Sequence, residues 1–207
     1  RLNINWCNYC GELDTYEWKA YELRKRHRLA DIEGRYQDSL DILLEMRKYL
    51  DMDRVTNYQY VKSREWIAKC RLGILQIDET CEKLEELLKR SQRLNLDTLN
   101  LVYYTQTELE MIAYMAQFFR QQKQYKEGIE LIECVIKQME NSKVKLEYQW
   151  NGFSFLLRVL CSLYFEIGEY DAVIKTANYV KGIMIRRREG ANLDVTLDEM
   201  ADALEHK

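Results

Sequence analysis

Two cysteines near the amino terminus have the spacing of a metal-binding or redox pair. Cys7 and Cys10 form a C-x-x-C motif. A structural zinc site needs four ligands, usually two such pairs or one pair with histidines, and the chain offers only His27 and His206 besides. A redox role requires a βαβ context, which the helical pattern of this sequence does not suggest. We interpret the motif as helical packing or chance spacing and expect neither a metal nor a cofactor.

The other four cysteines stand in apolar stretches with helical spacing. They are Cys70, Cys81, Cys134 and Cys161. With no secretory signal recognised in the sequence, we expect these thiols to be reduced and buried as small apolar side chains.

Residues that could carry catalysis are few. The sequence contains no G-x-S-x-G, no phosphate-cradling glycine-rich loop and no H-E-x-x-H. Adjacent carboxylates such as Glu85 and Glu86 fall on the polar side of an ordinary helix. We therefore expect a protein that is not an enzyme.

Two short basic runs, at residues 24–28 and 186–188, could contact phosphates. Glu22 and Asp31 lie within one helical turn of the first run, so a solvated helix face explains it equally well. The second run ends a predicted helix, where cations suit the helix dipole. The net charge of −3, from 31 basic and 34 acidic residues, lacks the basic excess typical of a nucleic-acid-binding domain.

The composition is typical of a soluble helical protein. The chain has 207 residues, of which 47% are hydrophobic and 31% charged, and it contains no proline. We find no apolar run long enough to span a membrane, and we expect a cytoplasmic protein without a membrane partner.

Apolar residues recur with the period of amphipathic helices along most of the chain. In the helix predicted at 39–50 we expect five residues to face inward: Leu40, Leu43, Leu44, Met46 and Leu50. Asp78 is a plausible N-cap, and Thr196 to Glu199 fits a capping box before a last helix with Leu197, Met200 and Leu204 at helical spacing. The predicted helices span 18–33, 39–50, 55–75, 80–90, 99–121, 125–140, 146–167, 170–187 and a short segment from about 196.

The helices are arranged in pairs that repeat. Tyr36, Ile77, Tyr125 and Tyr170 follow the turns between paired helices, and their separations of 41, 48 and 45 residues exceed the roughly 34 residues of a minimal tetratricopeptide repeat. A fixed internal pattern of this kind indicates stacked helical hairpins.

The fourth pair carries the tetratricopeptide pattern most clearly. Leu160, Cys161, Tyr164, Gly168 and Tyr170 supply its large, small, aromatic, glycine and aromatic residues. The small residue permits close helix approach, and glycine adopts the positive φ of the turn at low cost. The third pair matches through Met115, Ala116, Phe119 and Tyr125, with Lys123 in the glycine position. The first pair keeps Gly34 and Tyr36 but has His27 in the small position. The second pair matches at Ile67 and Ala68.

The chain thus resembles tetratricopeptide-like repeats over residues 18–187, and in particular the sensor domains of bacterial peptide-responsive regulators of the Rgg, PlcR and NprR type. In that family a helix-turn-helix domain precedes degenerate repeats that bind a short peptide and dimerise. The resemblance implies a sensing and homodimerisation domain whose DNA-binding domain is not in this chain, with DNA contacted only through that missing domain. The alternative is a tetratricopeptide-like scaffold for a partner protein, with no link to DNA.

The resemblance also implies which residues line a concave groove, because the first helix of each pair forms its inner wall. Amide groups there can satisfy an extended peptide, and an arginine can hold a carboxylate through two hydrogen bonds. The alternative for each residue is a solvated surface position. The candidates are Lys62, Glu65 and Lys69 in the second pair, Tyr114, Gln117 and Gln121 in the third, and Asn151, Phe155, Arg158 and Ser162 in the fourth.

The expected architecture is an all-α right-handed superhelix of about four helical hairpins with a C-terminal capping helix. Residues 1–17 form an N-terminal helix or linker remnant, residues 18–187 the repeat domain, and residues 188–207 the capping helix.

Overall fold

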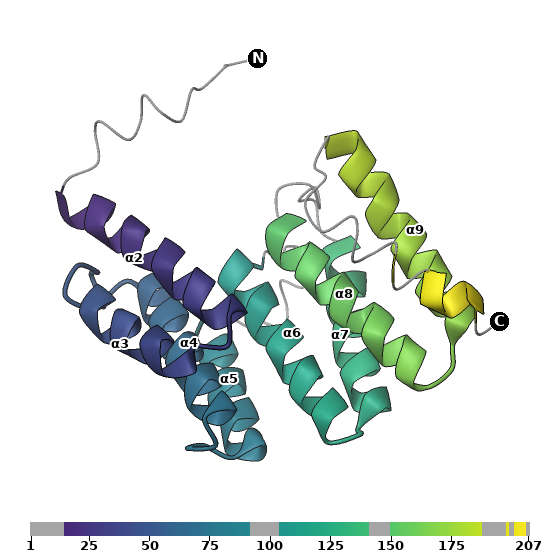
Figure 1. Ribbon diagram of the computed structural model, residues 1–207, viewed down its shortest axis with the longest axis horizontal. Coiled ribbons are helices and arrows are strands. Elements are labelled where there is room, and N and C mark those ends of the chain that lie inside the picture. The colour runs from purple at the N-terminus through teal and green to yellow at the C-terminus, as the bar shows by residue number, and fades with distance from the viewer. Residues whose placement is uncertain (1–14, 92–103, 141–149, 188–197, 199–200, 206–207) are drawn as a thin grey trace, which may run out of the picture. The chain divides into compact units, whose positions relative to one another are not determined.

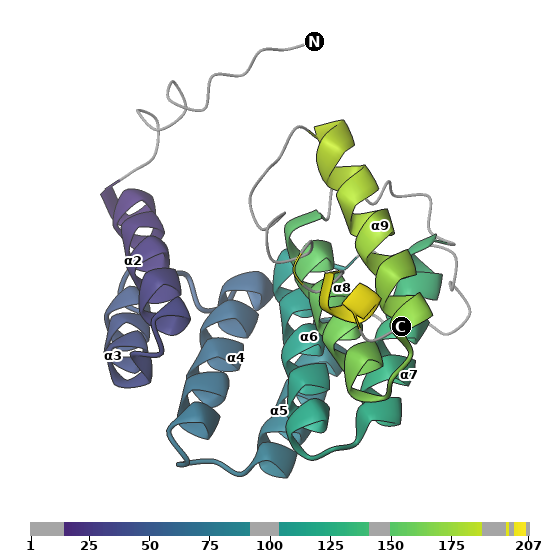
Figure 2. The same ribbon diagram turned by 45° about the vertical axis from the view of Figure 1, so that its right-hand side comes forward.

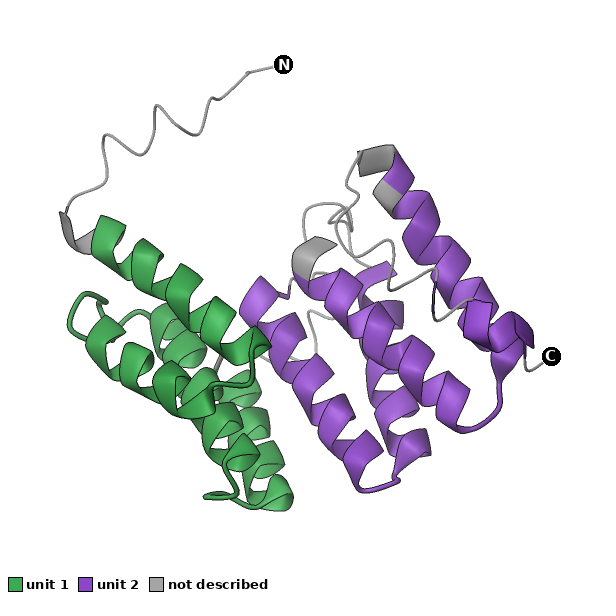
Figure 3. Cartoon of the chain, viewed as in Figure 1, with its two compact units in different colours: residues 1–91 green, residues 92–207 purple. Residues whose placement is uncertain are grey.

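A computed structural model describes residues 15–91, 104–140, 150–187, 198 and 201–205 of the chain. Each regular element within these ranges is an α-helix, and the chain divides into two compact units, residues 1–91 and 92–207 (Figure 3). The predictions for Cys7, Cys10 and the Thr196 capping box lie outside the described residues.

The first unit contains α2 (Thr15–Ile32), α3 (Tyr36–Met46), α4 (Val55–Arg71) and α5 (Ile77–Ser91), and each helix packs against the next (Figure 1). The core between α2 and α3 is made by four buried residues with Tyr49, Leu50 and Tyr60 packed against them. These buried residues are Leu23, Ala30, Ile42 and Met46.

The second unit contains α6 (Gln106–Gln121), α7 (Tyr125–Glu140), α8 (Trp150–Glu166) and α9 (Tyr170–Arg187). Helix α8 is central and packs against α6, α7 and α9 (Figure 2). The chain is helical again at 201–205, where the buried Ala203 packs against Cys161 and Val173. Tyr164 and Tyr170 are half-buried against the same cluster.

The turns inside the four hairpins share one hydrogen-bonded motif. Gly34, Gly73, Lys123 and Gly168 have φ values of 71°, 72°, 63° and 76°. In each turn the N–H of this residue donates to the carbonyl three residues earlier, and the next N–H donates to the carbonyl five before its own. This is the pattern of a Schellman helix end. The predicted use of Gly34 and Gly168, and of Lys123 in a glycine position, is confirmed.

The turn of the second hairpin is longer than the other three. The connections are 33–35, 122–124 and 167–169, whereas α4 and α5 are joined by 72–76. Ile77 still begins its helix, as Tyr36, Tyr125 and Tyr170 begin theirs. In the other three turns the left-handed residue lies two residues before the next helix begins, whereas Gly73 lies four residues before Ile77. Positions of α4 counted back from Ile77 are therefore not equivalent to those counted back from the left-handed residue. The second turn thus departs from the spacing that the other three share.

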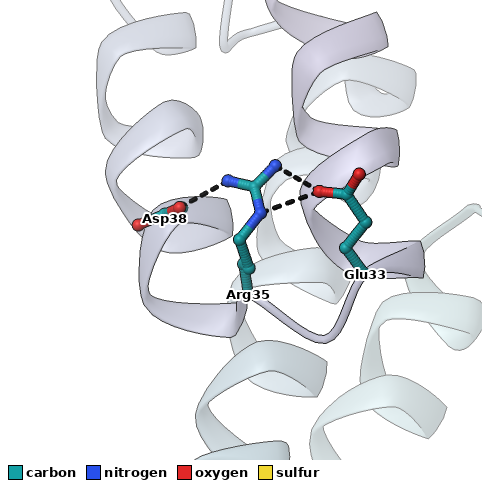
Figure 4. A network of polar contacts seen from close by, with 3 residues as sticks. All are labelled: Glu33, Arg35 and Asp38. Atoms are coloured by element: carbon teal, nitrogen blue, oxygen red, sulfur yellow. Dashed lines mark hydrogen bonds and ion pairs between the residues drawn. The ribbon is translucent and has the colours of Figure 1, made fainter.

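An exposed charge network ties the first turn to the start of α3 (Figure 4). The Arg35 Nε donates to Glu33 Oε2 at 2.8 Å, and Arg35 Nη1 donates to Asp38 Oδ2. The hydrogen bonds to Glu33, with those to Asp38, raise the pKa of the Arg35 guanidinium. Arg35 is also the N-cap residue of α3 and its side chain makes no capping hydrogen bond. The acidic Asp38 in the first turn suits the positive end of the helix dipole.

Several side chains differ from the sequence prediction because a surface helix buries only one stripe. Leu44 is 58% exposed, since α3 buries Leu40, Leu43 and Met46 instead. In the last helix Leu204 is exposed while Ala203 is buried. Asp78 lies inside the first turn of α5, which begins at Ile77.

The prediction of four buried cysteines is confirmed only for Cys161. Cys134 is exposed, and Cys70 and Cys81 are half-buried. Cys134 directly precedes the buried Val135 on α7, so it falls on the neighbouring solvent face of the helix.

Candidate ligand-binding face

Helices α6 and α8 approach each other closely at Gly152. A Cβ added to Gly152 would lie 2.8 Å from the Leu109 Cβ and 3.1 Å from the Gln106 carbonyl oxygen. Only glycine therefore fits without displacing α6. The sequence analysis did not single out Gly152, although a glycine inside a predicted helix is itself a signal of close packing.

An aromatic pair joins the same two helices farther along. The rings of Tyr114 on α6 and Phe155 on α8 meet edge to face, with centroids 5.3 Å apart. Both side chains are half-buried. This geometry is the one that aromatic quadrupoles favour, and it leaves an apolar, partly accessible surface.

A small polar pocket lies one helical turn beyond the aromatic pair. Its volume is about 40 Å³, enough for a few water-sized groups. Gln117 and Arg158 follow Tyr114 and Phe155 by three residues on their helices, so each pair lies on one helix face. The lining combines an amide, two guanidinium groups, a hydroxyl and an aliphatic side chain: Gln117, Arg120, Arg158, Val159 and Ser162.

The two arginines of the pocket are in different states. Arg120 donates from Nε and Nη2 to Glu166 Oε1, at 3.0 and 2.6 Å, and so forms an ion pair across the ends of α6 and α8. The Arg158 Nε is buried, and among the described residues it has no hydrogen-bond partner. A buried donor without an acceptor is costly. The pocket therefore presents one positive charge that its described neighbours do not neutralise.

The predicted groove residues of the second unit are brought together in part. Tyr114, Gln117, Phe155, Arg158 and Ser162 form one continuous face with the aromatic pair at one end and the pocket at the other. Gln121 is exposed at the end of α6. Asn151 lies on α8, and its side chain is outside the described part of the structure.

The sequence analysis missed Arg120 and Val159 as pocket residues. Arg120 directly precedes the predicted groove residue Gln121 and was not itself selected by the pattern. Val159 is buried and reaches the pocket only from the core side of α8.

The predicted residues of the second pair belong to the first unit and form an ion-pair cluster on α4. Glu65 binds Lys62 at 3.1 Å and Lys69 at 2.7 Å. Burial acts to raise the pKa of Glu65, but hydrogen bonds from Lys69 and Lys62 outweigh it, so the pKa is lowered. Both lysines share the one carboxylate, so the three side chains together carry one net positive charge.

The longer second turn also changes which residues of α4 are equivalent to the pocket. Gln117 and Ser162 each stand six residues before the left-handed residue of their turn, and the residue in that place on α4 is Ile67. Ile67 is buried. At this position the equivalence therefore places a buried side chain on α4.

No group of three or more His, Cys, Asp or Glu side chains that could hold a metal ion occurs in the described ranges. Within the same ranges no helix is both long and apolar enough to cross a membrane.

The helical hairpins, their shared turn motif and the face between α6 and α8 define an all-α fold of the tetratricopeptide-like type. Models of known protein families give no match to the chain, and neither do curated proteins. Solved structures do: the chain is similar to Bacillus thuringiensis PlcR, crystallised in complex with the peptide PapR7 and DNA and also in its apo form.

The similarity to PlcR lies in the three-dimensional structure and not in the amino-acid sequence. The TM-score is 0.71 for both crystal structures, with sequence identities of 14% and 15%. The aligned region covers 90% of this chain and 62% and 66% of the PlcR chains, so this chain spans less than two thirds of their length. Such a similarity establishes the fold, and it confirms the predicted tetratricopeptide-like architecture.

Proposed function

We propose that this chain is a peptide-sensing and homodimerisation domain of a cytoplasmic bacterial transcriptional regulator whose DNA-binding domain is not in this chain. The observation that carries the proposal is the face between α6 and α8. There an apolar aromatic pair, Tyr114 and Phe155, lies beside a polar pocket in which the Arg158 Nε has no hydrogen-bond partner among the described residues. The fold is shared with PlcR, which was crystallised with a peptide and DNA.

The chemistry of this face suits a short extended peptide. The aromatic pair accepts an apolar side chain, while Gln117 and the pocket hydroxyl and guanidinium groups can meet polar groups of the peptide. In a regulator, binding would favour one arrangement of protomers over another, and so change the spacing of attached DNA-binding domains.

A pool of mixed-sequence heptapeptides tests the proposal directly. The protein is incubated with the pool and separated by size exclusion, and the peptides that co-elute with it are identified by mass spectrometry. We expect enrichment of a restricted set of peptides that is reduced by Tyr114→Ala and left unchanged by the matched substitution Tyr36→Ala on α3. A pool recovered without enrichment contradicts peptide sensing.

Homodimerisation is tested separately by sedimentation velocity with and without the enriched peptide. We expect a dimer whose sedimentation or stability changes with peptide. A monomer at all concentrations contradicts this part of the proposal. The scaffold alternative is favoured if the protein binds only folded protein partners and no peptide from the pool.

A further inference from the structure

We infer that the pocket between α6 and α8 is a carboxylate site that anchors one end or one acidic side chain of the ligand. This inference rests on the proposed function, because it assigns the ligand chemistry at the same face. It is argued from the state of Arg158 and from the charges that surround it.

The first step of the argument is the unsatisfied donor. The Nε of Arg158 is buried, and no acceptor reaches it from the described residues. Folding removed this N–H from water without replacing the lost hydrogen bond, which is unfavourable for a buried polar group. Arg158 also lines the adjacent pocket, so an acceptor oxygen placed there would lie close to its side chain.

The second step is the charge balance. Arg120, the other cation of the pocket, is paired with Glu166 at 2.6 Å. No ion pair between Arg158 and a carboxylate occurs within the described residues, so a net positive charge stays at the pocket. An anion is therefore favoured over a neutral acceptor, and hydrogen bonds to ionised groups are about twice as strong as neutral ones.

The third step is the shape of the anion. A guanidinium group offers a planar fork that matches the two oxygens of a carboxylate. The pocket volume of about 40 Å³ suits a small planar group. The remaining ligand would extend from the pocket toward the apolar surface of Tyr114 and Phe155, which lie on the same two helices. The pocket would thus take a carboxylate attached to an apolar group.

The buried Arg158 N–H supplies a probe for the test that does not depend on knowing the peptide. Protein labelled with ¹⁵N is titrated, at constant ionic strength, with N-acetyl-leucine, with N-acetyl-leucinamide and with inorganic phosphate. A further titration with N-acetyl-aspartic acid α-amide, in which only the side-chain carboxylate is free, distinguishes a side-chain carboxylate from a chain terminus. The chemical shift of the Arg158 Nε–H resonance is followed, and Arg158→Gln assigns it.

We expect saturable shifts with the carboxylate compounds and none with N-acetyl-leucinamide. The tighter binder of N-acetyl-leucine and N-acetyl-aspartic acid α-amide identifies the source of the carboxylate. Tighter binding of phosphate, an equal response to N-acetyl-leucinamide, or no saturable response to any compound overturns the carboxylate site.

The peptide pool then separates this inference from the proposed function. In wild-type protein, blocking both C-termini and acidic side chains as amides should weaken retention about tenfold or more. Arg158→Gln should weaken retention of the unblocked pool similarly, whereas Arg26→Gln, the same change on the exposed side of α2, should not. Retention unaffected by amidation and by Arg158→Gln overturns the carboxylate site and leaves peptide sensing standing.

Discussion

Lys123 and Gly168 occupy equivalent positions in the turns after α6 and α8, and both have left-handed backbone conformations, with φ values of 63° and 76°. In both turns the following N–H, of Gln124 or Glu169, donates to a carbonyl five residues earlier, at 2.9 and 3.0 Å. The turn geometry is therefore kept even where a side chain makes it unfavourable. The fold, and not the local preference of lysine, determines this backbone conformation.

The first prediction is that Lys123→Gly stabilises the protein. Because glycine has no Cβ to resist a positive φ, we expect the free energy of unfolding to rise by about 0.5–1 kcal/mol. Urea denaturation measures the change. The matched variant Lys137→Gly, at an exposed position inside α7, should instead lower the free energy of unfolding by a similar amount. A loss of stability in Lys123→Gly would contradict the left-handed assignment.

The second prediction concerns acid stability and His27, which is 2% exposed. The Nδ1 of His27 lies 3.3 Å from the Tyr60 hydroxyl, and its Nε2 has no partner among the described residues. Burial, together with the nearby positive charge of Arg64, lowers the pKa of His27 to about 4, although Asp31 acts in the opposite direction. The folded protein therefore favours neutral His27.

The sign of the pH dependence follows from proton binding. Between pH 6.5 and about 4, the unfolded chain binds a proton at His27 and the folded chain does not. Acidification through this window should therefore destabilise the fold, by up to about 1.4 kcal/mol per pH unit from this group. Denaturant unfolding across the window should show that His27→Gln removes this contribution, whereas His206→Gln keeps it. An unchanged slope in His27→Gln would refute the buried neutral state.

The third prediction compares two helical glycines. Gly152→Ala should lower the free energy of unfolding by about 1–3 kcal/mol, because the new Cβ would meet the Leu109 Cβ at 2.8 Å, and neither helix can move without loss of packing. Gly128→Ala should cost less, since its nearest neighbours are the flexible Leu163 methyls at 3.0 and 3.2 Å. Thermal and urea unfolding measure both. Equal effects would mean that α6 and α8 are not in close contact at Gly152.

The fourth prediction concerns the aromatic pair of the candidate ligand-binding face. A double-mutant cycle with Tyr114→Leu and Phe155→Leu should show a coupling energy of about 0.5–1.5 kcal/mol, the range for edge-to-face aromatic pairs. The same cycle on Trp18 and Phe155, which lie in different units, should show additive effects. Additive effects for Tyr114 and Phe155 would show that their contact at 5.3 Å does not contribute to stability.

The sequence predicted the repeat well because its signals are local. Tyr36, Ile77, Tyr125 and Tyr170 were identified as the residues after each turn, and each begins its helix. Apolar periodicity and turn residues act within a few positions of the chain, so they can be seen without knowledge of the tertiary contacts.

The features that the sequence did not predict depend on packing between helices. Leu44 matches the apolar stripe of α3, but it is exposed because no helix in the described ranges covers it. The two extra residues between Gly73 and Ile77 change which positions of α4 are equivalent to positions of α6 and α8. The Arg120 contribution to the pocket arises from its ion pair with Glu166 on another helix, a contact that no local pattern reveals.

The central claim, that the face between α6 and α8 binds a peptide, is tested most directly by site-specific photo-crosslinking. A benzophenone amino acid replaces Gln117 in the pocket or, in a control protein, Arg26 on α2, and each protein is irradiated with the heptapeptide pool. We predict peptide adducts at position 117 that unlabelled enriched peptide suppresses, and none above background at position 26. Adducts at position 26 alone, or no suppressible adduct at position 117, would contradict the account.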